Sequence, residues 1–379
     1  MSWPVRILHA HSTFALGGKE GRAVRLMNAF GPAADHVVLS AVPDQLSARA
    51  AIAPGVAVSF PDDAPPLAGS PTPVRLLRLA RYMRRFDLVL TYNWGAMDAV
   101  MARRTFGGPV LIHHEDGFNR DEAVALKSRR NLYRRAALAG AWRLVVPSTR
   151  LEQIARTAWG QLPRRIVRIA NGIPVDLYSG PPEPGAFPGL GAAGERIVIG
   201  TVAGLRPVKN LPRLVRAFAA MGMKDACLVI VGTGPESERI AAEARRCGVA
   251  DRVHMPGFMA EPWRWIGHFD IFALSSDSEQ APISLIEAMA AGLPCVSTDV
   301  GDVCAMVSAD NRPLIVACED EAGFASALDS LAERPDLRKA IGRANRQKAA
   351  AENDEAAMIA AYARLYGEAI GDAGAFSPA

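Results

Sequence analysis

Residues 179–194 read SGPPEPGAFPGLGAAG and separate two similar halves of the sequence. The stretch holds four prolines and five glycines, a composition that supports no regular helix or strand, so we interpret it as a linker. On both sides of it, short apolar segments alternate with helical patterns, which is typical of a parallel sheet covered by helices. The chain has 379 residues, more than one hydrophobic core usually organises. The sequence therefore predicts two α/β domains.

The predicted boundaries follow from this division. We expect an N-terminal domain at 1–178, the linker at 179–195, a C-terminal domain at 196–355, and a helix with a tail at 356–379. Because ligands of open parallel sheets bind beyond the carboxyl ends of the strands, we expect the function to lie in a cleft between the two domains. The expected strands are 5–10, 36–41, 87–92, 110–113 and 142–147, then 197–202, 228–231, 253–255, 271–274, 295–297 and 314–316, with closing helices at 322–333 and 356–370.

Composition excludes several classes of protein. Half of the residues are hydrophobic and 22% are charged, unlike a disordered chain. No apolar run approaches the roughly 20 residues that span a bilayer. The N-terminus carries Arg6 inside its apolar run, unlike a signal peptide, so we expect a cytoplasmic protein. The five cysteines form no C-x-x-C pair, and we expect them to be reduced and mostly buried.

Charge is distributed unevenly. Residues 1–190 hold 24 basic against 14 acidic residues, whereas the remainder holds 19 against 25. A basic N-terminal half favours an anionic partner, although no aromatic-rich signature supports nucleic acid binding. Two segments are rich in arginine, the first of them at helical spacing, and we interpret both as contacts to an anionic membrane surface, with an ordinary solvated face as the alternative. The arginines are Arg75, Arg78, Arg81 and Arg85 within 74–85, and Arg129, Arg130, Arg134 and Arg135 within 127–135.

Three glycine-rich or basic turns follow expected strands. Gly17 and Gly18 allow backbone N–H groups to approach a phosphate at a helix N-terminus, or they form a plain tight turn. Arg206 and Lys209, three residues apart, converge on one diphosphate or are solvated loop charges. The third turn contains Gly232 and Gly234. Either it leaves room for a flat ligand against the backbone, or it is a turn without function.

Residues 275–294 are the most informative segment. Pro282 suits the first turn of a helix and Gly292 suits its end, which puts Glu279 in the preceding loop and Glu287 within the helix. The two carboxylates can then accept hydrogen bonds from a polyol, beside a helix N-terminus that favours negative charge. The alternative is a solvated helix with unrelated glutamates.

These residues resemble a known family. Glu279 and Glu287 match the E-x7-E motif of retaining GT-B glycosyltransferases of family 4, and residues 287–290 and 292–294 match its flank. The resemblance implies two doubly wound Rossmann-like domains facing a central cleft, with the C-terminal helix returning to the N-terminal domain. It extends in the family's order over residues 17–18, 171–173, 206, 209 and 232–235.

The resemblance also implies roles. A nucleotide diphosphate sugar, UDP- or GDP-linked, would be held mainly by the C-terminal domain and the acceptor by the N-terminal domain, with metal-independent transfer, retention at the anomeric carbon and no cofactor. Arg206 and Lys209 would bind the diphosphate, Glu287 the ribose hydroxyls and Glu279 the sugar hydroxyls. The implied donor site comprises Gly17, Gly18, Arg206, Lys209, Gly232, Gly234, Glu279, Gln280, Ala281, Pro282, Ile283 and Glu287.

The sequence departs from the family in two places. Members often carry a histidine where this chain has Asp116, which leaves open whether His113 or His114 substitutes or whether Glu115 and Asp116 contact the acceptor. Asp302 and Ala305 stand where Gly and Glu are common, so the sugar cannot be inferred from the family. The catalytic candidates are therefore Glu279, Arg206, Lys209, His113, His114 and Asp116, and the acceptor candidates are Asn93, Glu115 and Asp116.

We expect a hexosyltransferase that acts on a saccharide acceptor, lipid-linked, in cell-surface or exopolysaccharide biosynthesis. It would be cytoplasmic and peripheral on the inner face of the membrane. Two alternatives remain: a nucleotide-sugar epimerase of similar architecture, and a catalytically silent sugar-nucleotide sensor.

Overall fold

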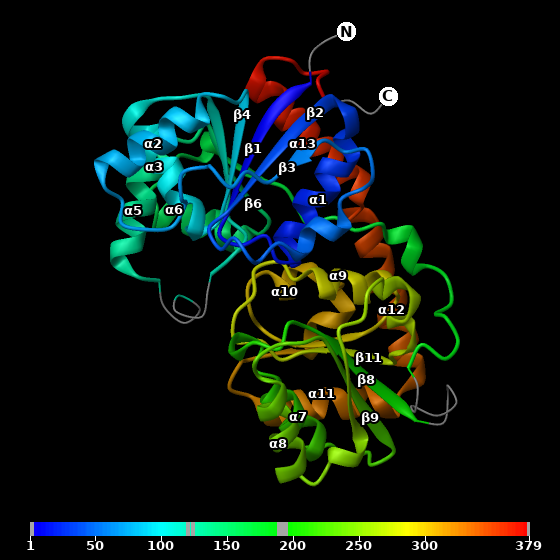
Figure 1. Cartoon of the computed structure of the whole chain (residues 1–379). Helices are drawn as coiled ribbons and strands as arrows, with labels where there is room; N and C mark the ends of the chain where they lie inside the picture. Colours follow the sequence, from blue (N-terminus) through cyan, green and yellow to red (C-terminus); the bar gives the residue numbers. More distant parts are fainter. Residues whose placement is uncertain (1–3, 119–121, 123–125, 188–195, 377–379) are drawn as a thin grey trace. The chain divides into compact units, whose positions relative to one another are not determined.

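A computed structural model describes residues 4–118, 122, 126–187 and 196–376 of the chain. The chain forms two compact units (Figure 1). Unit 1 comprises Met1–Asn171 and Ala356–Ala379, and unit 2 comprises Gly172–Glu355. The first boundary lies seven residues before the predicted end of the N-terminal domain, because the backbone N–H of Ile173 donates to Asn353 and its carbonyl accepts from Glu355. These bonds tie the segment to the end of unit 2.

Unit 1 is built on a parallel sheet with the strand order β3-β2-β1-β4-β5-β6-β7. Successive strands are added on one side of β1 and, after β4, on the opposite side of the sheet. The neighbours β1 and β4 therefore form the topological switch point, where ligands of such sheets bind. Every residue of β4 is buried, as the core of a sheet covered on both faces requires. The strands are β1 (Val5–His11), β2 (Ala34–Ser40), β3 (Val58–Ser59), β4 (Leu88–Tyr92), β5 (Val110–His114), β6 (Arg143–Val146) and β7 (Ile166–Arg168).

Helices cover both faces of this sheet. Alternate strand residues point to opposite sides, so Leu88 and Leu90 pack with one helix group and Val89 with the other. The group α1 (Gly18–Phe30) and α13 (Glu355–Ile370) packs on the first face, and Figure 1 shows these two helices side by side. The C-terminal helix thus returns to unit 1, as predicted. The other face is covered by α2 (Pro73–Met83), α3 (Met97–Phe106), α5 (Ser128–Leu138) and α6 (Thr149–Thr157).

Unit 2 repeats this design with the strand order β10-β9-β8-β11-β12-β13. Its switch point lies between β8 and β11, so the loops that follow these two strands share one edge of the sheet. The strands are β8 (Ile197–Val202), β9 (Ala226–Val231), β10 (Val253–Gly257), β11 (Ile271–Leu274), β12 (Cys295–Thr298) and β13 (Ile315–Val316). The helices are α7 (Leu211–Ala220), α8 (Ser237–Arg246), α9 (Ile283–Ala290), α10 (Val303–Met306), α11 (Glu321–Glu333) and α12 (Pro335–Glu352).

The predicted fold class of two parallel-sheet, Rossmann-like units is confirmed, but some elements were missed. The largest is α12, an 18-residue helix that the sequence prediction left out. Only Ile341, Gly342, Asn345 and Ala349 of this helix are buried, so its apolar stripe is too narrow and too interrupted for periodicity to reveal. The short edge strands β3 and β7 were also missed.

Two expectations concern cysteines and membranes. All five cysteines are free; Cys227 and Cys295 are buried, and the other three are partly exposed. Among the helices of the described residues, none combines the length and apolar character that crossing a bilayer requires.

Candidate functional site

The loops after β8 and β11 bring the predicted basic and acidic residues of unit 2 together. Lys209 ends a short 3-10 helix, Pro207–Lys209, that follows β8, and Arg206 precedes it as an exposed residue. Glu279 lies in the loop between β11 and α9. The Lys209 ammonium forms an ion pair with the Glu279 carboxylate, and the Ser276 hydroxyl donates to Glu279 Oε1 at 2.7 Å. Residues 70 positions apart in sequence therefore form one charged pair at the edge of the sheet.

Helix α9 holds the second predicted glutamate. Glu287 lies within the helix and Glu279 precedes it, as predicted. Glu287 is buried and its Oε1 accepts a hydrogen bond from the Tyr178 hydroxyl at 3.2 Å. Pro282 stands one residue before the helix rather than in its first turn, and Gly292 follows its end with a φ of +78°. The amide groups of the first turn of α9 therefore adjoin the loop of Glu279.

Gly301 holds the Glu279 loop in place from the other side. Its φ is +58°, and a Cβ there would lie 2.5 Å from the Glu279 carbonyl oxygen. The backbone N–H of Asp302 donates to the Gln280 carbonyl at 2.9 Å. This close approach fixes the backbone at Glu279 and Gln280, the first two residues of the predicted donor-binding stretch 279–283, which also includes Ala281.

The glycine pair after β9 has a structural partner. Gly232 and Gly234 both have positive φ angles, and a Cβ on them would lie 1.9 Å from the Ala203 carbonyl oxygen and 2.4 Å from that of Leu205, respectively. The backbone N–H of Leu205 donates to Thr233 at 2.9 Å. Glycine is required here because the loop after β9 packs against the loop that carries Arg206.

In unit 1, Gly17 and Gly18 stand at the start of α1, at the switch point of the sheet. Gly17 is the N-cap residue and has an extended conformation, with no side chain to cap the helix. The Glu20 side chain folds back toward it, because a Cβ on Gly17 would lie 3.0 Å from Glu20 Oε2. Glu20 is buried and pairs with Lys19.

Asp116 is bound by Asn93, a predicted acceptor residue, and by Arg22, which the sequence analysis did not identify. Arg22 on α1 is buried and pairs with Asp116, with 2.9 Å between Nη2 and Oδ2, and it also donates to Asn171 Oδ1 at 3.1 Å. Asn93 Oδ1 accepts from the backbone N–H of Asp116 at 2.8 Å. Burial would raise the pKa of Asp116, but the charge and hydrogen bonds of Arg22 lower it below the usual value. Asp116 is therefore a carboxylate held in a fixed position.

The three residues before Asp116 point into the interior of unit 1. His113 Nδ1 lies 2.8 Å from Thr91 Oγ1, and His114 Nε2 lies 2.9 Å from the Tyr366 hydroxyl on α13. Glu115 is fully buried with Arg134, whose Nε lies 3.6 Å from Glu115 Oε2. Burial and the nearby Arg22 charge lower the pKa of His114 to about 3, so this imidazole is neutral at physiological pH. These positions favour Asp116 over its three neighbours as a contact for a ligand.

The predicted arginine stripes need correction at two residues. Arg75 is held by unit 1 itself, because it donates to the carbonyls of Pro66 and Leu67 and to Asp98. Arg134 is buried and forms a bidentate pair with Glu122 at 2.9 Å. Arg130 also pairs with Glu122 and is partly buried. The exposed members of the two segments are Arg78, Arg81, Arg85, Arg129 and Arg135.

Metal ligands are not gathered at these loops. In the described part of the chain, no three His, Cys, Asp or Glu side chains are grouped so that they could hold a metal ion.

Two doubly wound parallel sheets, one in each unit, are the architecture of GT-B proteins. Residues 16–177 match the family model described as Glycosyltransferase Family 4, and residues 186–348 match that described as Glycosyl transferases group 1. The chain therefore belongs to the GT-B glycosyltransferase family of this type. The predicted family is confirmed by two models that follow each other along the sequence.

Relatives and solved structures agree with this family. The chain is 27% identical over 179 residues to N-acetyl-alpha-D-glucosaminyl L-malate synthase of Bacillus anthracis, covering 47% of each chain. It is 30% identical over 208 residues to the putative glycosyltransferase EpsF of Bacillus subtilis, covering 52% of this chain and 53% of EpsF. The matches thus span about half the length of these two curated relatives.

A longer match is the D-inositol 3-phosphate glycosyltransferase of Kribbella flavida, 25% identical over 331 residues and covering 79% of this chain and 78% of the relative. Among solved structures, Anabaena HepE in complex with UDP has a TM-score of 0.77 at 17% identity, covering 96% of this chain and all of HepE. The sucrose-phosphate synthase of Thermosynechococcus elongatus has a TM-score of 0.78 at 18% identity, covering 97% and 99%. These two likenesses concern the fold.

Proposed function

We propose that the protein is a retaining, metal-independent glycosyltransferase that moves a hexose from a nucleotide diphosphate sugar to a saccharide acceptor. The observation that carries the proposal is the Lys209–Glu279 pair, which stands between the ends of β8 and β11 and next to the N-terminus of α9. HepE, which shares this fold, has been solved with UDP and with UDP-glucose. A nucleotide sugar donor is the ligand class that these observations support.

The chemistry follows from where negative charge develops. Breaking the anomeric bond leaves an anionic nucleoside diphosphate, which fixed positive groups stabilise as its charge grows. Lys209 and Arg206 would supply those charges, and the amide groups that start α9 would add oriented dipoles. Glu279, oriented by Ser276, would accept hydrogen bonds from the sugar hydroxyls.

The nucleoside end of the donor would lie at Glu287. Its carboxylate is buried and is held by the Tyr178 hydroxyl, so it is positioned to accept the two hydroxyls of a ribose. Asp116 of unit 1, fixed by Arg22 and Asn93, would contact the acceptor. We propose a lipid-linked saccharide as the acceptor. The proposed role is the synthesis of cell-surface polysaccharide or exopolysaccharide.

Product formation from a radiolabelled donor tests the proposal. Lys209→Ala and Glu287→Ala should each lower kcat/KM by roughly 10²-fold or more, because each removes a group that stabilises the transition state. Lys348→Ala is the matched control, since Lys348 is a partly exposed lysine of the same unit that pairs with Glu352 on α12. Equal turnover by the wild type and the Lys209 and Glu287 variants would refute the proposed site.

The donor base can be identified by thermal shift. A ligand that binds only the folded protein raises its melting temperature, so a panel of UDP- and GDP-linked sugars should contain a stabilising compound. The shift should persist in a chelator if the site binds the diphosphate without a metal. A shift that vanishes with chelator would contradict the metal-independent mechanism.

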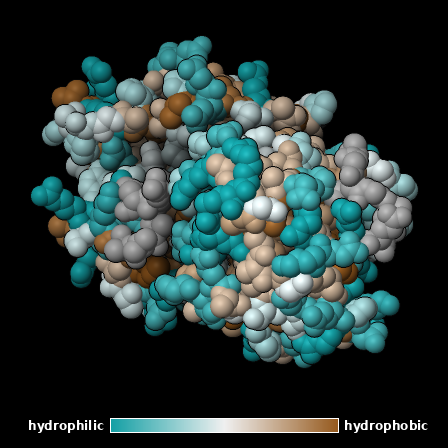
Figure 2. Space-filling view, turned by 90° about the horizontal axis from the view of Figure 1, so that it is seen from below, coloured by the Kyte–Doolittle hydropathy of each residue, from teal (hydrophilic) through white to brown (hydrophobic). Residues whose placement is uncertain are grey.

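We also propose that exposed arginines of unit 1 bind an anionic leaflet. Arg78, Arg81 and Arg85 are exposed, which suits attraction to anionic headgroups by charge. On the one face of the molecule that Figure 2 shows, the most strongly hydrophobic residues lie in small separate patches. Changing Arg78, Arg81 and Arg85 together to glutamine should reduce sedimentation with vesicles containing anionic lipid. The control changes the same number of exposed arginines of unit 2, Arg239, Arg245 and Arg246. Equal sedimentation of both triple variants would contradict the proposal.

A further inference from the structure

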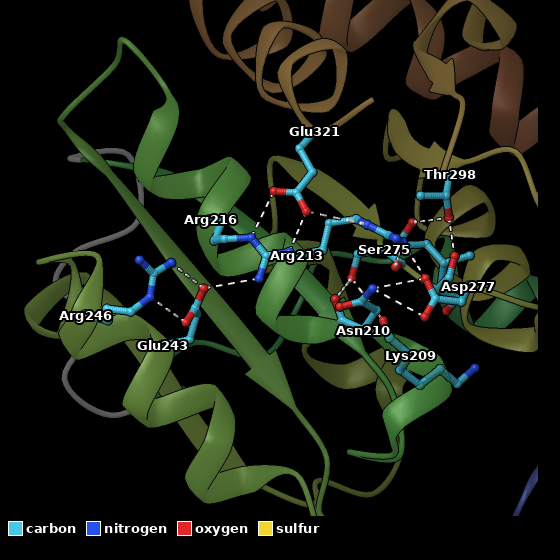
Figure 3. A network of polar contacts seen from close by, with 12 residues as sticks. Lys209, Asn210, Arg213, Arg216, Glu243, Arg246, Ser275, Asp277, Thr298 and Glu321 are labelled. Carbon is cyan, nitrogen blue, oxygen red and sulfur yellow. Dashed lines mark hydrogen bonds and ion pairs between the residues drawn. The ribbon is translucent and has the colours of Figure 1, made fainter. Parts of the chain in front are cut away.

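Asp277 joins the two loops that carry Lys209 and Glu279. Its Oδ1 accepts a hydrogen bond from Asn210 Nδ2 at 3.0 Å and forms an ion pair with Arg213, whose Nη1 lies 2.8 Å away. Its backbone N–H donates to the Val208 carbonyl at 2.8 Å. Figure 3 shows this carboxylate with Asn210 and Arg213 around it. One aspartate thus binds the side chains and the backbone of the facing loop.

The backbones of the two loops are connected on the other side as well. The Ser275 hydroxyl contacts the carbonyl oxygens of Lys209 and Asn210, at 3.1 and 3.2 Å. Arg213 Nη1 donates to the Ser275 carbonyl at 3.0 Å. The Lys209 loop and the segment from Ser275 to Asp277 are therefore fixed to each other at several points along their length.

The conformation of Asn210 makes this contact possible. Asn210 has a left-handed backbone, with φ +42° and ψ +46°, and stands between Lys209 and the start of α7. Asparagine is among the few residues other than glycine that adopt this conformation readily. Its side chain does not cap α7 and instead donates to both carboxylate oxygens of Asp277. The sharp turn after Lys209 is thereby bound to the loop of Glu279.

Other charged residues continue this network toward the surface. Arg213 Nε lies 4.0 Å from Glu321 on α11, and Glu321 pairs with Arg216. Glu243 of α8 then pairs with Arg216 and with Arg246, which is exposed. In Figure 3 the chain of contacts runs from Arg246 at one end to the loop of Lys209 at the other. Only the inner end touches the two loops, so the outer end provides a control of the same chemistry.

We propose that Asn210, Arg213 and Asp277, here called the loop clamp, are positioning residues for the transfer reaction. The inference rests on the proposed function of Lys209 and Glu279, which lie one and two residues away from Asn210 and Asp277. The loop clamp sets the distance between the cation on one loop and the carboxylate on the other. A displacement of about 1 Å in such an arrangement can cost about 10²-fold in rate. In this proposal the clamp residues act through Lys209 and Glu279 and do not bind the donor or the acceptor themselves.

Asp277→Ala should lower kcat by about 10-fold to 10²-fold with a smaller change in KM. Arg206 and Glu287 would still bind the donor, but Lys209 and Glu279 would no longer be held at the right distance from each other. Arg246→Ala, at the outer end of the network, should leave both constants unchanged. Asp277→Ala with the kcat of the wild type would overturn the proposal.

A swap of the pair separates positioning from general loss of structure. Asn210→Asp alone places two carboxylates opposite each other and should lower kcat by a similar factor. Adding Asp277→Asn restores one amide donor and one carboxylate acceptor, while Arg213 keeps its hydrogen bond to the Ser275 carbonyl. The double variant should recover most of the wild-type kcat. A double variant no faster than the slower single variant would contradict the clamp.

Hydrogen exchange distinguishes failure of the clamp from failure of the proposed function. In Asp277→Ala, the amides of residues 205–213 and 275–280 should exchange at least 10-fold faster, while those of β9 keep their wild-type rates. Unchanged protection of both loops would overturn the clamp whatever the reaction. Faster exchange together with full activity of Lys209→Ala would instead retain the loop contact and refute the assignment of Lys209.

Discussion

Gly301 shows how closely the Glu279 loop is packed. Its left-handed backbone and its contact with the Glu279 carbonyl leave no room for a side chain. Gly301→Ala should therefore destabilise unit 2 by about 1 kcal/mol or more and lower kcat/KM by at least roughly 10-fold. Gly248→Ala is the matched control, because Gly248 has a φ of +67° but no atom within 4 Å of the added Cβ. If Gly301→Ala and Gly248→Ala lose the same amount of stability and neither loses kcat/KM, Gly301 does not position Glu279.

The sequence predicted the charged residues of the site better than the residues that hold them in place. Lys209 and Glu279 were expected at one site and the structure brings them together, because each follows the carboxyl end of a strand beside the switch point. Asn210 and Asp277 were not predicted, since their contact depends on how two irregular loops cross. The burial of His114 was also missed, because it depends on Tyr366, which lies 252 residues further along the chain.

At the scale of elements, α13 is joined to the sheet of unit 1 by a polar contact inside an apolar interface. The Tyr366 hydroxyl meets His114 Nε2 at 2.9 Å, where both side chains are buried. Tyr366→Phe should lower the free energy of unfolding by about 1 to 3 kcal/mol, since a buried imidazole nitrogen loses its partner. Tyr362→Phe, one turn earlier on α13, is the comparison for denaturant unfolding. Equal stability of both variants would contradict a role for the Tyr366 hydroxyl.

Most elements could be predicted because their pattern reflects burial on two faces. The central strands of both units are short apolar runs, and the prediction located all of them. The α12 helix was missed since its surface is polar on nearly every side and its few buried residues include Gly342 and Asn345. Helix α12 packs against α9 and α11. Its place in the fold therefore depends on these neighbours and not on a pattern in its own sequence.

At the scale of the whole molecule, unit 1 should be sensitive to mild acid. Burial lowers the pKa of His36 to about 4 and that of His114 to about 3, and it also lowers the pKa of His9. These histidines bind protons in the unfolded chain near pH 6.5 but stay neutral in the folded unit. Stability should therefore be complete above about pH 6.5 and fall as the pH decreases toward 4.

Thermal unfolding between pH 4 and 8 measures this dependence. Each buried histidine should contribute a slope of up to about 1.4 kcal/mol per pH unit in that window. His36→Gln should reduce the slope, because it removes one group that titrates only on unfolding. A melting temperature that is constant from pH 7 to 5 would show that these histidines are not buried in their neutral form.

The proline- and glycine-rich segment 179–194 does not mark the boundary, because its residues 179–187 lie in unit 2, while 188–194 lie outside the described residues. The presence of two units was predictable, because two series of apolar segments alternate with helical patterns along the sequence. The place where the chain passes from unit 1 to unit 2 was not, since it depends on backbone bonds between Ile173 and residues 353 and 355. The return of α13 came from the family resemblance and not from any local pattern.

The central claim is that the basic and acidic residues of unit 2 bind one sugar diphosphate. A crystal structure of the protein with a bound nucleotide sugar, chosen by thermal shift, tests it most directly. We expect the diphosphate at Lys209 and Arg206, the sugar hydroxyls at Glu279 and the ribose at Glu287. A nucleotide sugar bound elsewhere, with Lys209 and Glu279 still paired only to each other, would contradict the account.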